Sequence, residues 1–478
     1  METTDSIEYR IEHDLIGDAK VPQSAYYGVQ TQRAVDNFPI TGIRLNHYAE
    51  LPRAIAMVKK ACALANRDVG MLDAEKAGYI AAACDEIIEG KLHDQFVVDM
   101  VQGGAGTSTN MNGNDVICNR ALELMGHKKG EYQYLHPNNH VNMAQSTNDA
   151  YPTSIRLSMV LKTDHLIESL KNLKAIFDAK ADEFKDVLKV GRTQLMDAVP
   201  MTLGQEFRAF ADTLGEDLVR LKENVKLLCE MNLGATAIGT GITADCHYAP
   251  EAIKHLTEVS GHQMILASDL IEATSDMGAF VMYSSTLKRL AVKLSKISND
   301  LRLLASGPFC GLHEINLPDR QPGSTIMPGK VNPVIPECMS QISYHVIGND
   351  VTVTMCSEAA QLQLNAMEPM IAFSILDSIQ QLSNGMDMLG SKCVKDITAN
   401  PEICMEYVER SVSLVTALNP YIGYENSTRI ARTAMKTGEK VIDLVRKENL
   451  LSDEQLAEIL KPENMIAPIN LAKVAVIH

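Results

Sequence analysis

Apolar residues recur every three or four positions over long stretches of this 478-residue chain, and this periodicity limits its possible folds more than any other feature. Such spacing puts the apolar side chains on one face of an α-helix. Three long stripes fall between about residues 155 and 305, and another helix is expected after Pro336. The stripes are Leu166, Leu170, Leu173 and Phe177; Phe207, Phe210, Leu214, Leu218, Leu221, Val225 and Leu228; and Phe280, Tyr283, Leu287, Leu290, Leu294, Ile297, Leu301 and Leu304. The sequence therefore predicts a mainly α fold with a bundle of long, nearly parallel helices.

The regions on either side of this bundle have a different character. Shorter helices are expected near residues 52–66 and 73–89, and a short amphipathic helix near 452–460. We therefore predict three domains: an N-terminal mixed α domain over 1–142, a central long-helix bundle domain over 143–398, and a small C-terminal helical domain over 399–478. One chain could complete the bundle alone, or several subunits could share it; the length of the helices favours the shared bundle.

The charge and the cysteines narrow the class of protein. The net charge of −16, from 44 basic and 60 acidic residues, argues against nucleic acid or an anionic membrane as the main partner. No run of about 18 apolar residues suggests a membrane span, and the N-terminus lacks a signal-peptide pattern. The ten cysteines include no C-x-x-C pair, which is typical of reduced thiols. We expect a cytoplasmic protein.

Four polar loops interrupt the helical pattern, and all of them are rich in hydroxyls and amides. They are QGGAGTSTNMN at 102–112, HPNNHVNMAQSTNDAYPT at 136–153, GRTQLMDAVP at 191–200 and GSTIMPGKVNP at 323–333. Helix capping or turn formation would explain any single loop. Four loops that offer the same hydrogen-bond donors, together with one lysine, favour recognition of carboxylates without a metal.

Motifs for bound nucleotides and metals are missing from the sequence. It contains no H-E-x-x-H, no phosphate loop and no G-x-S-x-G elbow, and we interpret GATAIGTG at 234–241 as a turn region. Any chemistry should then need no nucleotide, no redox cofactor and no obligatory metal. Ser324 could act as a base if positive charge and N–H groups stabilised its alkoxide, and Lys330 lies six residues away. On chemistry alone, a base and a simple turn residue are equally open interpretations of Ser324.

GSTIMPGKVNP resembles the signature loop of the aspartase/fumarase superfamily, usually G-S-S-x-M-P-x-K-x-N. YYGVQTQRAVDNF, QGGAGTSTNMN, HVNMAQSTNDAYPT, GRTQLMDAVPMTLGQEF and NLGATAIGTG also resemble blocks of this superfamily, in the same order and over nearly the whole chain. Two of these blocks are more similar to aspartases than to class II fumarases, which typically carry W-G and S-S-N-D-T where this chain has Tyr27-Gly28 and residues 146–150.

The resemblance implies an enzyme that eliminates ammonia reversibly from L-aspartate to give fumarate. It assigns Ser324 as the catalytic base. It implies substrate-binding roles for Thr107, Ser146, Thr147, Asn148, Thr193, Gln194, Thr325, Lys330 and Asn332. It also implies a homotetramer in which each active site draws loops from three chains. No cofactor is expected to be required, although a divalent cation such as Mg²⁺ could activate the enzyme.

Two positions depart from the usual pattern of the superfamily. Gln194 stands where many members have histidine; because glutamine cannot relay a proton, it favours ammonia elimination over the chemistry of water. Thr325 stands where serine is usual. His136 and His140 are expected to be structural, because Pro137 argues against the helix that a metal-binding pair would need. The alternatives are a class II fumarase, a lyase acting on a succinyl-bearing substrate, and a catalytically silent structural protein such as a lens crystallin.

Overall fold

A computed structural model describes residues 8–468 and confirms the mainly α fold, with 63% of the chain in helices. The strands that it contains form four two-stranded sheets. The chain divides into two compact units. The first comprises the chain up to Glu168, Val219–Ala291 and Tyr344–Ser383, and the second comprises Ser169–Leu218, Val292–Ser343 and the chain from Asn384 onward. The three-domain division at residues 142 and 398 stays a prediction.

The first unit opens with a β-hairpin and short helices. Its N-terminal elements are β1 (Tyr9–Asp14), β2 (Gly17–Pro22), α1 (Val29–Asn37), α2 (Glu50–Asp68), α3 (Ala74–Ile88) and α4 (Thr107–Leu124). Later in the chain come β5 (Glu230–Met231), α7 (Tyr248–Ser260), β6 (Ile265–Leu266) and α8 (Leu270–Ser275). The buried faces of α2 and α7 pack together in a core that includes Ala54, Cys62, Tyr248 and Leu256.

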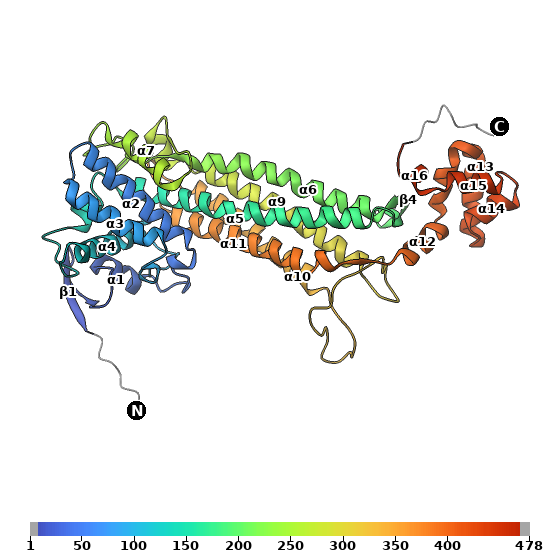
Figure 1. The fold of residues 1–478 in the computed structure, drawn as a ribbon, viewed down its shortest axis with the longest axis horizontal. Coiled ribbons are helices and arrows are strands. Elements are labelled where there is room, and N and C mark those ends of the chain that lie inside the picture. The colour runs from blue at the N-terminus through green and yellow to red at the C-terminus, as the bar shows by residue number, and fades with distance from the viewer. Residues whose placement is uncertain (1–7, 469–478) are drawn as a thin grey trace. The chain divides into compact units, whose positions relative to one another are not determined.

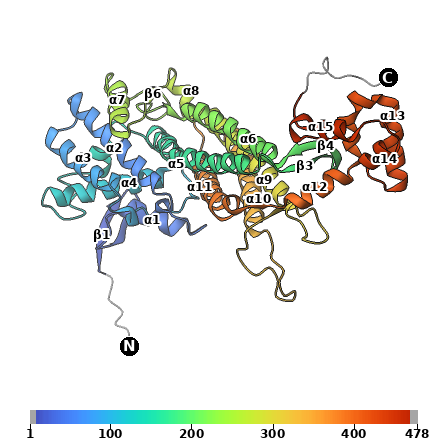
Figure 2. The same cartoon turned by 45° about the vertical axis from the view of Figure 1, so that its right-hand side comes forward.

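The predicted stripes form long helices. These are α5 (Thr147–Glu183), α6 (Leu203–Asn224), α9 (Gly278–Leu304), α10 (Val334–Glu358) and α11 (Glu368–Lys392). In the first unit, a hydrogen bond joins Thr163 on α5 to Tyr283 on α9, and Ser284 on α9 donates to Asp350 on α10. In the second unit, Phe177 on α5 packs against Phe207 on α6. Figures 1 and 2 show these helices running alongside one another, as the 3-4 spacing predicts.

The second unit carries the hairpin of β3 (Leu188–Thr193) and β4 (Met196–Thr202), and the small sheet of β7 (Ile315–Asn316) and β8 (Thr398–Ala399). Its C-terminal helices are α12 (Pro401–Arg410), α13 (Val415–Thr437), α14 (Val441–Lys447), α15 (Asp453–Ile459) and α16 (Pro462–Met465). A separate apolar cluster that includes Leu418, Ile430, Leu444 and Leu456 holds α13, α14 and α15 together. Ser452 caps α15 through a reciprocal capping box with Gln455.

Two local expectations are wrong, each for a backbone reason. The predicted polar loop at 191–200 is a β-hairpin, in which Gln194 and Leu195 turn the chain with positive φ. The helix expected after Pro336 is present as α10, which begins at Val334 because a proline in the first turn loses no intrahelical hydrogen bond. Pro137 likewise opens a short π-helical turn, Pro137–Val141, rather than preventing a helix.

Candidate active site

Two helix N-termini in the first unit carry the first group of predicted site residues. Thr107 is the first residue of α4 and Thr147 is the first residue of α5. Asn110, one turn into α4, donates from Nδ2 to the Thr147 Oγ1 atom over 3.3 Å, so the two N-termini adjoin. Several first-turn N–H groups, such as those of Thr109 and Asn148, already donate within the chain, but the dipole at a helix N-terminus still attracts anions. This region of the first unit is therefore suited to a carboxylate.

The first turn of α5 is held by a reciprocal cap. The Ser146 N–H donates to Asp149 Oδ1 over 2.9 Å, and the Asn148 N–H donates to Ser146 Oγ over 3.2 Å. Asn148 Nδ2 in turn donates to the carbonyl oxygen of Ala237 over 2.7 Å. Ser146, Thr147 and Asn148 are thus brought to one place by α5.

Asp149 connects this turn to the glycine-rich segment 234–241, and sequence reasoning missed it. Its buried carboxylate accepts the N–H groups of Gly234 and Thr236, each over 3.0 Å. Burial raises the pKa of Asp149 to about 6, although these backbone donors act in the opposite direction. Segment 234–241 is a turn region, as expected, and it is bonded directly to the predicted site. The available signal was the acidic residue three positions after Ser146, which is the pattern of a helix cap.

The second unit presents Thr193 and Gln194 at the exposed tip of the β3–β4 hairpin. A fully buried carboxylate holds the base of this hairpin. The Glu314 side chain is 0% exposed. Its Oε2 atom lies 2.8 Å from Lys189 Nζ, and its Oε1 atom lies 2.6 Å from Arg192 Nη1. Its two cationic partners both lie on β3, so Glu314 fixes the strand that leads to the predicted binding residues.

The signature loop, 323–333, is an irregular segment closed at its base. The Gly323 N–H donates to the Lys330 carbonyl oxygen over 2.8 Å, and Asn332 Nδ2 donates to the Gly323 carbonyl oxygen over 2.6 Å. A Cβ at Gly323 would lie 2.6 Å from the Lys330 carbonyl oxygen and 2.8 Å from the Asn332 nitrogen, so only glycine fits there. One hydrogen of the Asn332 amide group remains available for another acceptor.

Within this loop, the Ser324 hydroxyl oxygen faces two backbone donors. The N–H groups of Ile326 and Met327 donate to Ser324 Oγ over 3.2 and 3.0 Å. Donors aimed at an oxygen stabilise its deprotonated form and lower the cost of making an alkoxide. Lys330 and Asn332 line a cavity of about 1000 Å³ in the second unit, together with Arg302 and His313. The loop thus supplies two backbone donors that would stabilise a Ser324 alkoxide.

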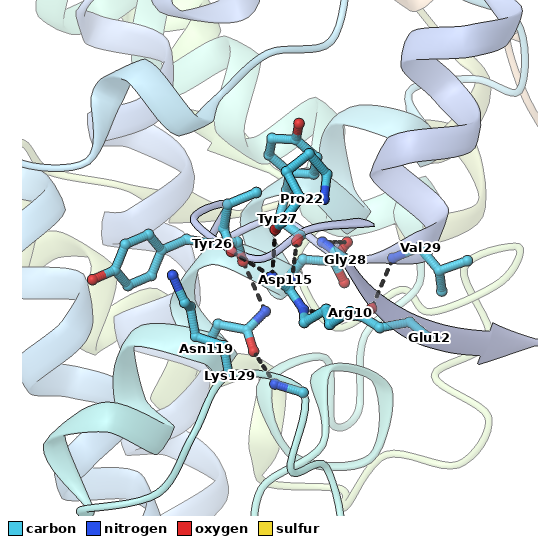
Figure 3. A network of polar contacts seen from close by, with 12 residues as sticks. Arg10, Glu12, Pro22, Tyr26, Tyr27, Gly28, Val29, Asp115, Asn119 and Lys129 are labelled. Atoms are coloured by element: carbon cyan, nitrogen blue, oxygen red, sulfur yellow. Dashed lines mark hydrogen bonds and ion pairs between the residues drawn. The ribbon is translucent and has the colours of Figure 1, made fainter. Parts of the chain in front are cut away.

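The YYGVQT block near the N-terminus is held by two buried carboxylates (Figure 3). Asp115 accepts the Gly28 N–H over 2.9 Å, and Glu12 accepts the Val29 N–H over 2.8 Å. Arg10 donates to the Tyr27 carbonyl oxygen over 2.6 Å and to Glu12 over 2.7 Å. Burial, with the nearby Glu12 charge acting in the same direction, raises the pKa of Asp115 to about 7.

Two groups of side chains in the described chain could hold a metal, and the members of one of them are already engaged in ion pairs. Two groups in the described chain bring three ligand atoms within 4.8 Å: Asp245, Cys246 and His247, and Asp68, Glu251 and His255. In the second group, His255 pairs with Asp68 over 2.7 Å and Lys254 pairs with Glu251 over 3.1 Å. His136 and His140 each use Nδ1 to accept backbone N–H groups, which is a structural role.

The ten predicted residues divide between the two units. Those of the first unit are Thr107, Ser146, Thr147 and Asn148, and those of the second are Thr193, Gln194, Ser324, Thr325, Lys330 and Asn332. Each unit brings its own residues to loops and element ends. Their convergence on a single substrate stays a prediction.

Comparison with known proteins identifies the family. A protein-family model described as "Lyase" matches residues 17–348, and one described as "Fumarase C C-terminus" matches residues 414–467. The chain is 63% identical to an aspartate ammonia-lyase of Pseudomonas fluorescens over 461 residues, which are 96% of each chain. The chain belongs to the aspartase/fumarase superfamily.

Other members of the aspartase/fumarase superfamily agree with this assignment. An aspartate ammonia-lyase of Escherichia coli is 52% identical over 97% of each chain. A crystal structure of "fumarate lyase:delta crystallin" from Brucella melitensis bound to cobalt has a TM-score of 0.94 and 53% identity, and the match covers 96% of this chain and all of that one. A class II fumarase of Schistosoma mansoni has a TM-score of 0.92 at 34% identity, and the match covers 97% of this chain and all of that one. The fold is therefore that of the superfamily, as the resemblance implied.

Proposed function

We propose that this protein is a carbon–nitrogen lyase that eliminates ammonia reversibly from L-aspartate to form fumarate. Relatives named aspartate ammonia-lyase are 52–63% identical over nearly the full length, whereas the class II fumarase is 34% identical. The observation that carries the mechanism is the pair of backbone N–H groups that face Ser324 Oγ. These donors support Ser324 as the base that removes a proton from carbon.

In the proposed reaction, the Ser324 alkoxide takes a proton from Cβ of aspartate and becomes a hydroxyl. The electron pair left on carbon moves into the β-carboxylate, which becomes an enediolate with two negative charges. The pair then forms the carbon–carbon double bond as the Cα–N bond breaks, and the substrate ammonium leaves as neutral ammonia. Donors that bind the enediolate more tightly than the carboxylate lower this barrier.

The proposed binding roles follow the donors in the two units. The β-carboxylate would be bound by Thr107, Ser146 and Thr147 and by the loop N–H groups near Thr325. The α-carboxylate would be bound by Thr193, Lys330 and Asn332. Asn148 would position the amino group, and Gln194 would donate or accept a hydrogen bond without relaying a proton. The helix N-termini at Thr107 and Thr147 support the first assignment, because the developing charge is negative.

This chemistry uses only groups of the protein, so we propose that no cofactor takes part in it. A divalent cation such as Mg²⁺ would then act away from the reacting atoms. We further propose a cytoplasmic homotetramer whose active sites are shared between subunits, with the small-molecule substrate and no nucleic acid or membrane as its partner. No helix in the described part of the chain has the length and apolar character that a membrane crossing needs.

Absorbance of fumarate in the ultraviolet tests the function directly. Purified protein should form fumarate from L-aspartate and should leave malate unchanged. Ser324→Ala should lower kcat at least about 10³-fold, because the base is removed, while the thermal midpoint stays within a few degrees. Ser391→Ala, at an exposed serine on α11, is the matched control and should retain full turnover.

Two results would contradict these assignments. Turnover of malate without turnover of aspartate would identify the chain as a fumarase instead. Substantial turnover by Ser324→Ala would leave the reaction in place but remove Ser324 from the role of base.

A further inference from the structure

Lys59 is a buried cation behind the N-termini of α4 and α5. It lies on α2, its residue is 1% exposed, and Nζ donates to Asn110 Oδ1 over 2.6 Å, Asn142 Oδ1 over 3.0 Å and Gln145 Oε1 over 2.7 Å. All three acceptors are neutral amides. Within residues 8–468, no carboxylate lies at ion-pair distance from Lys59 Nζ.

An arrangement of this kind is costly for folding. Burial lowers the pKa of Lys59 to about 8, and the nearby groups that act in the opposite direction are Asp149 and the thiols of Cys62 and Cys84. An apolar residue of similar shape would avoid the desolvation of the ammonium group. The position of this charge therefore requires an explanation other than stability.

The lysine dictates the direction of the hydrogen bonds around it. An ammonium group only donates, so Asn110 must turn its carbonyl oxygen toward Lys59. The Asn110 amide nitrogen then donates to Asn142 Oδ1 over 3.1 Å, an oxygen that also accepts from Lys59, and to Thr147 Oγ1 over 3.3 Å. Because the Thr147 hydroxyl accepts this bond, its own hydrogen is left to donate to another group.

We propose that Lys59 is a positioning residue that acts through Asn110 to keep the Thr147 hydroxyl a donor toward a bound dicarboxylate. The inference rests on the proposed function, in which Thr147 binds the carboxylate that becomes the enediolate. The same lysine orients Asn142 and Gln145 in the segment that leads into α5, and so fixes the backbone before Ser146.

The first test compares Lys59→Met with Lys60→Met. Methionine keeps the length and the apolar stem of the side chain and removes the charge. Lys60 is the next residue of the same helix, but it pairs with Asp85 over 2.6 Å and is partly exposed, so it is a matched control. Succinate, a saturated dicarboxylate, serves as the probe in isothermal titration calorimetry, and kcat and KM for L-aspartate are measured in parallel.

We expect Lys59→Met to weaken succinate binding at least about tenfold, with the number of sites per chain unchanged, and to lower kcat more than it raises KM. Lys60→Met should match the wild-type protein in both measurements. A purely structural role for Lys59 would instead reduce the number of binding sites while the remaining sites kept the wild-type dissociation constant. That result, or a Lys59→Met protein with wild-type binding and turnover, would overturn the proposal.

Asn110→Asp keeps the proposal falsifiable if Lys59→Met does not fold. The aspartate has the shape of asparagine and would form an ion pair with Lys59, so the fold should persist. The introduced carboxylate cannot donate to Thr147, so the Thr147 hydroxyl would donate to this carboxylate and would no longer be available to donate to the substrate. We expect at least about tenfold weaker succinate binding and lower kcat; wild-type values would overturn the proposal.

The readouts also separate this inference from the proposed function. A wild-type protein that binds succinate but forms no fumarate from aspartate would refute the function, and the succinate affinities of the variants would still decide the role of Lys59. A wild-type protein that binds no succinate would overturn both.

Discussion

At the residue scale, single atoms decide whether the candidate site can form. Ser324 has a hydroxyl that accepts two N–H groups, and Lys59 has an ammonium group that donates to three side-chain amides. Gly106 is a third case, because it starts α4 with φ of 89° directly before Thr107. A Cβ at Gly106 would overlap the ring of Tyr151 on α5. The absence of a side chain here allows the two helix N-termini to approach each other.

Gly106→Ala should therefore destabilise the protein by about 3 kcal/mol, from steric overlap together with the left-handed backbone. The measurement is the midpoint of thermal or urea unfolding. Gly78→Ala is the matched control: Gly78 lies on the exposed face of α3 with open space around it, so alanine should stabilise this helix by roughly 0.5–1 kcal/mol. Equal effects of the two substitutions would contradict the packing argument.

At the element scale, Asp115 on α4 holds the start of α1 by accepting the Gly28 N–H and the Thr31 hydroxyl. Its pKa is raised from 3.8 to about 7 by burial. The folded protein therefore binds a proton over a pH range in which the unfolded chain has released it. The stability from this proton is fully present below about pH 4 and is lost as the pH rises to about 7.

Asp115→Asn removes this titration and keeps an oxygen that can accept both hydrogen bonds. The difference in unfolding midpoint, variant minus wild type, should be larger at pH 8.5 than at pH 5 by at least about 2 °C. Asp36→Asn, at an exposed position on α1, should give nearly the same difference at both pH values. A relative midpoint that did not change between the two pH values would show that Asp115 is charged in the folded protein throughout this range.

At the scale of the whole molecule, the proposed tetramer predicts complementation between inactive variants. Thr107 belongs to the first unit and Ser324 to the second, and the proposal draws each active site from several chains. Thr107→Val and Ser324→Ala should each be nearly inactive alone. Mixed tetramers should recover up to about a quarter of wild-type turnover. In the proposed tetramer each active site takes its two loops from different subunits, and random assembly supplies both loops intact in about a quarter of the sites.

Coexpression with two affinity tags isolates the mixed tetramers for this assay. Coexpressed Ser324→Ala and Lys330→Ala provide the control, because both substitutions lie in the same loop and no subunit can supply it intact. Failure of the first pair to recover more turnover than the control would contradict the shared site.

The sequence by itself determined the class of fold and the composition of the candidate site. A stripe such as Phe280 to Leu304 is local information, because helical periodicity specifies a buried face without reference to any partner. The loop at 323–333 was likewise predictable, since its glycines and prolines exclude regular structure. The superfamily followed from several such motifs in order along the chain.

Only the tertiary structure decided which groups orient those motifs. The hairpin at 188–202, the buried Glu314 at its base, and the tie from Asp149 to Gly234 all depend on residues distant in sequence. Lys59 was hidden for the same reason: in the sequence it is one of two adjacent lysines on a helix, and only packing shows which of them is buried among amides. Periodicity predicts which face of a helix a side chain occupies. The desolvation of that side chain and the direction of its hydrogen bonds depend on the groups that contact it in the folded chain.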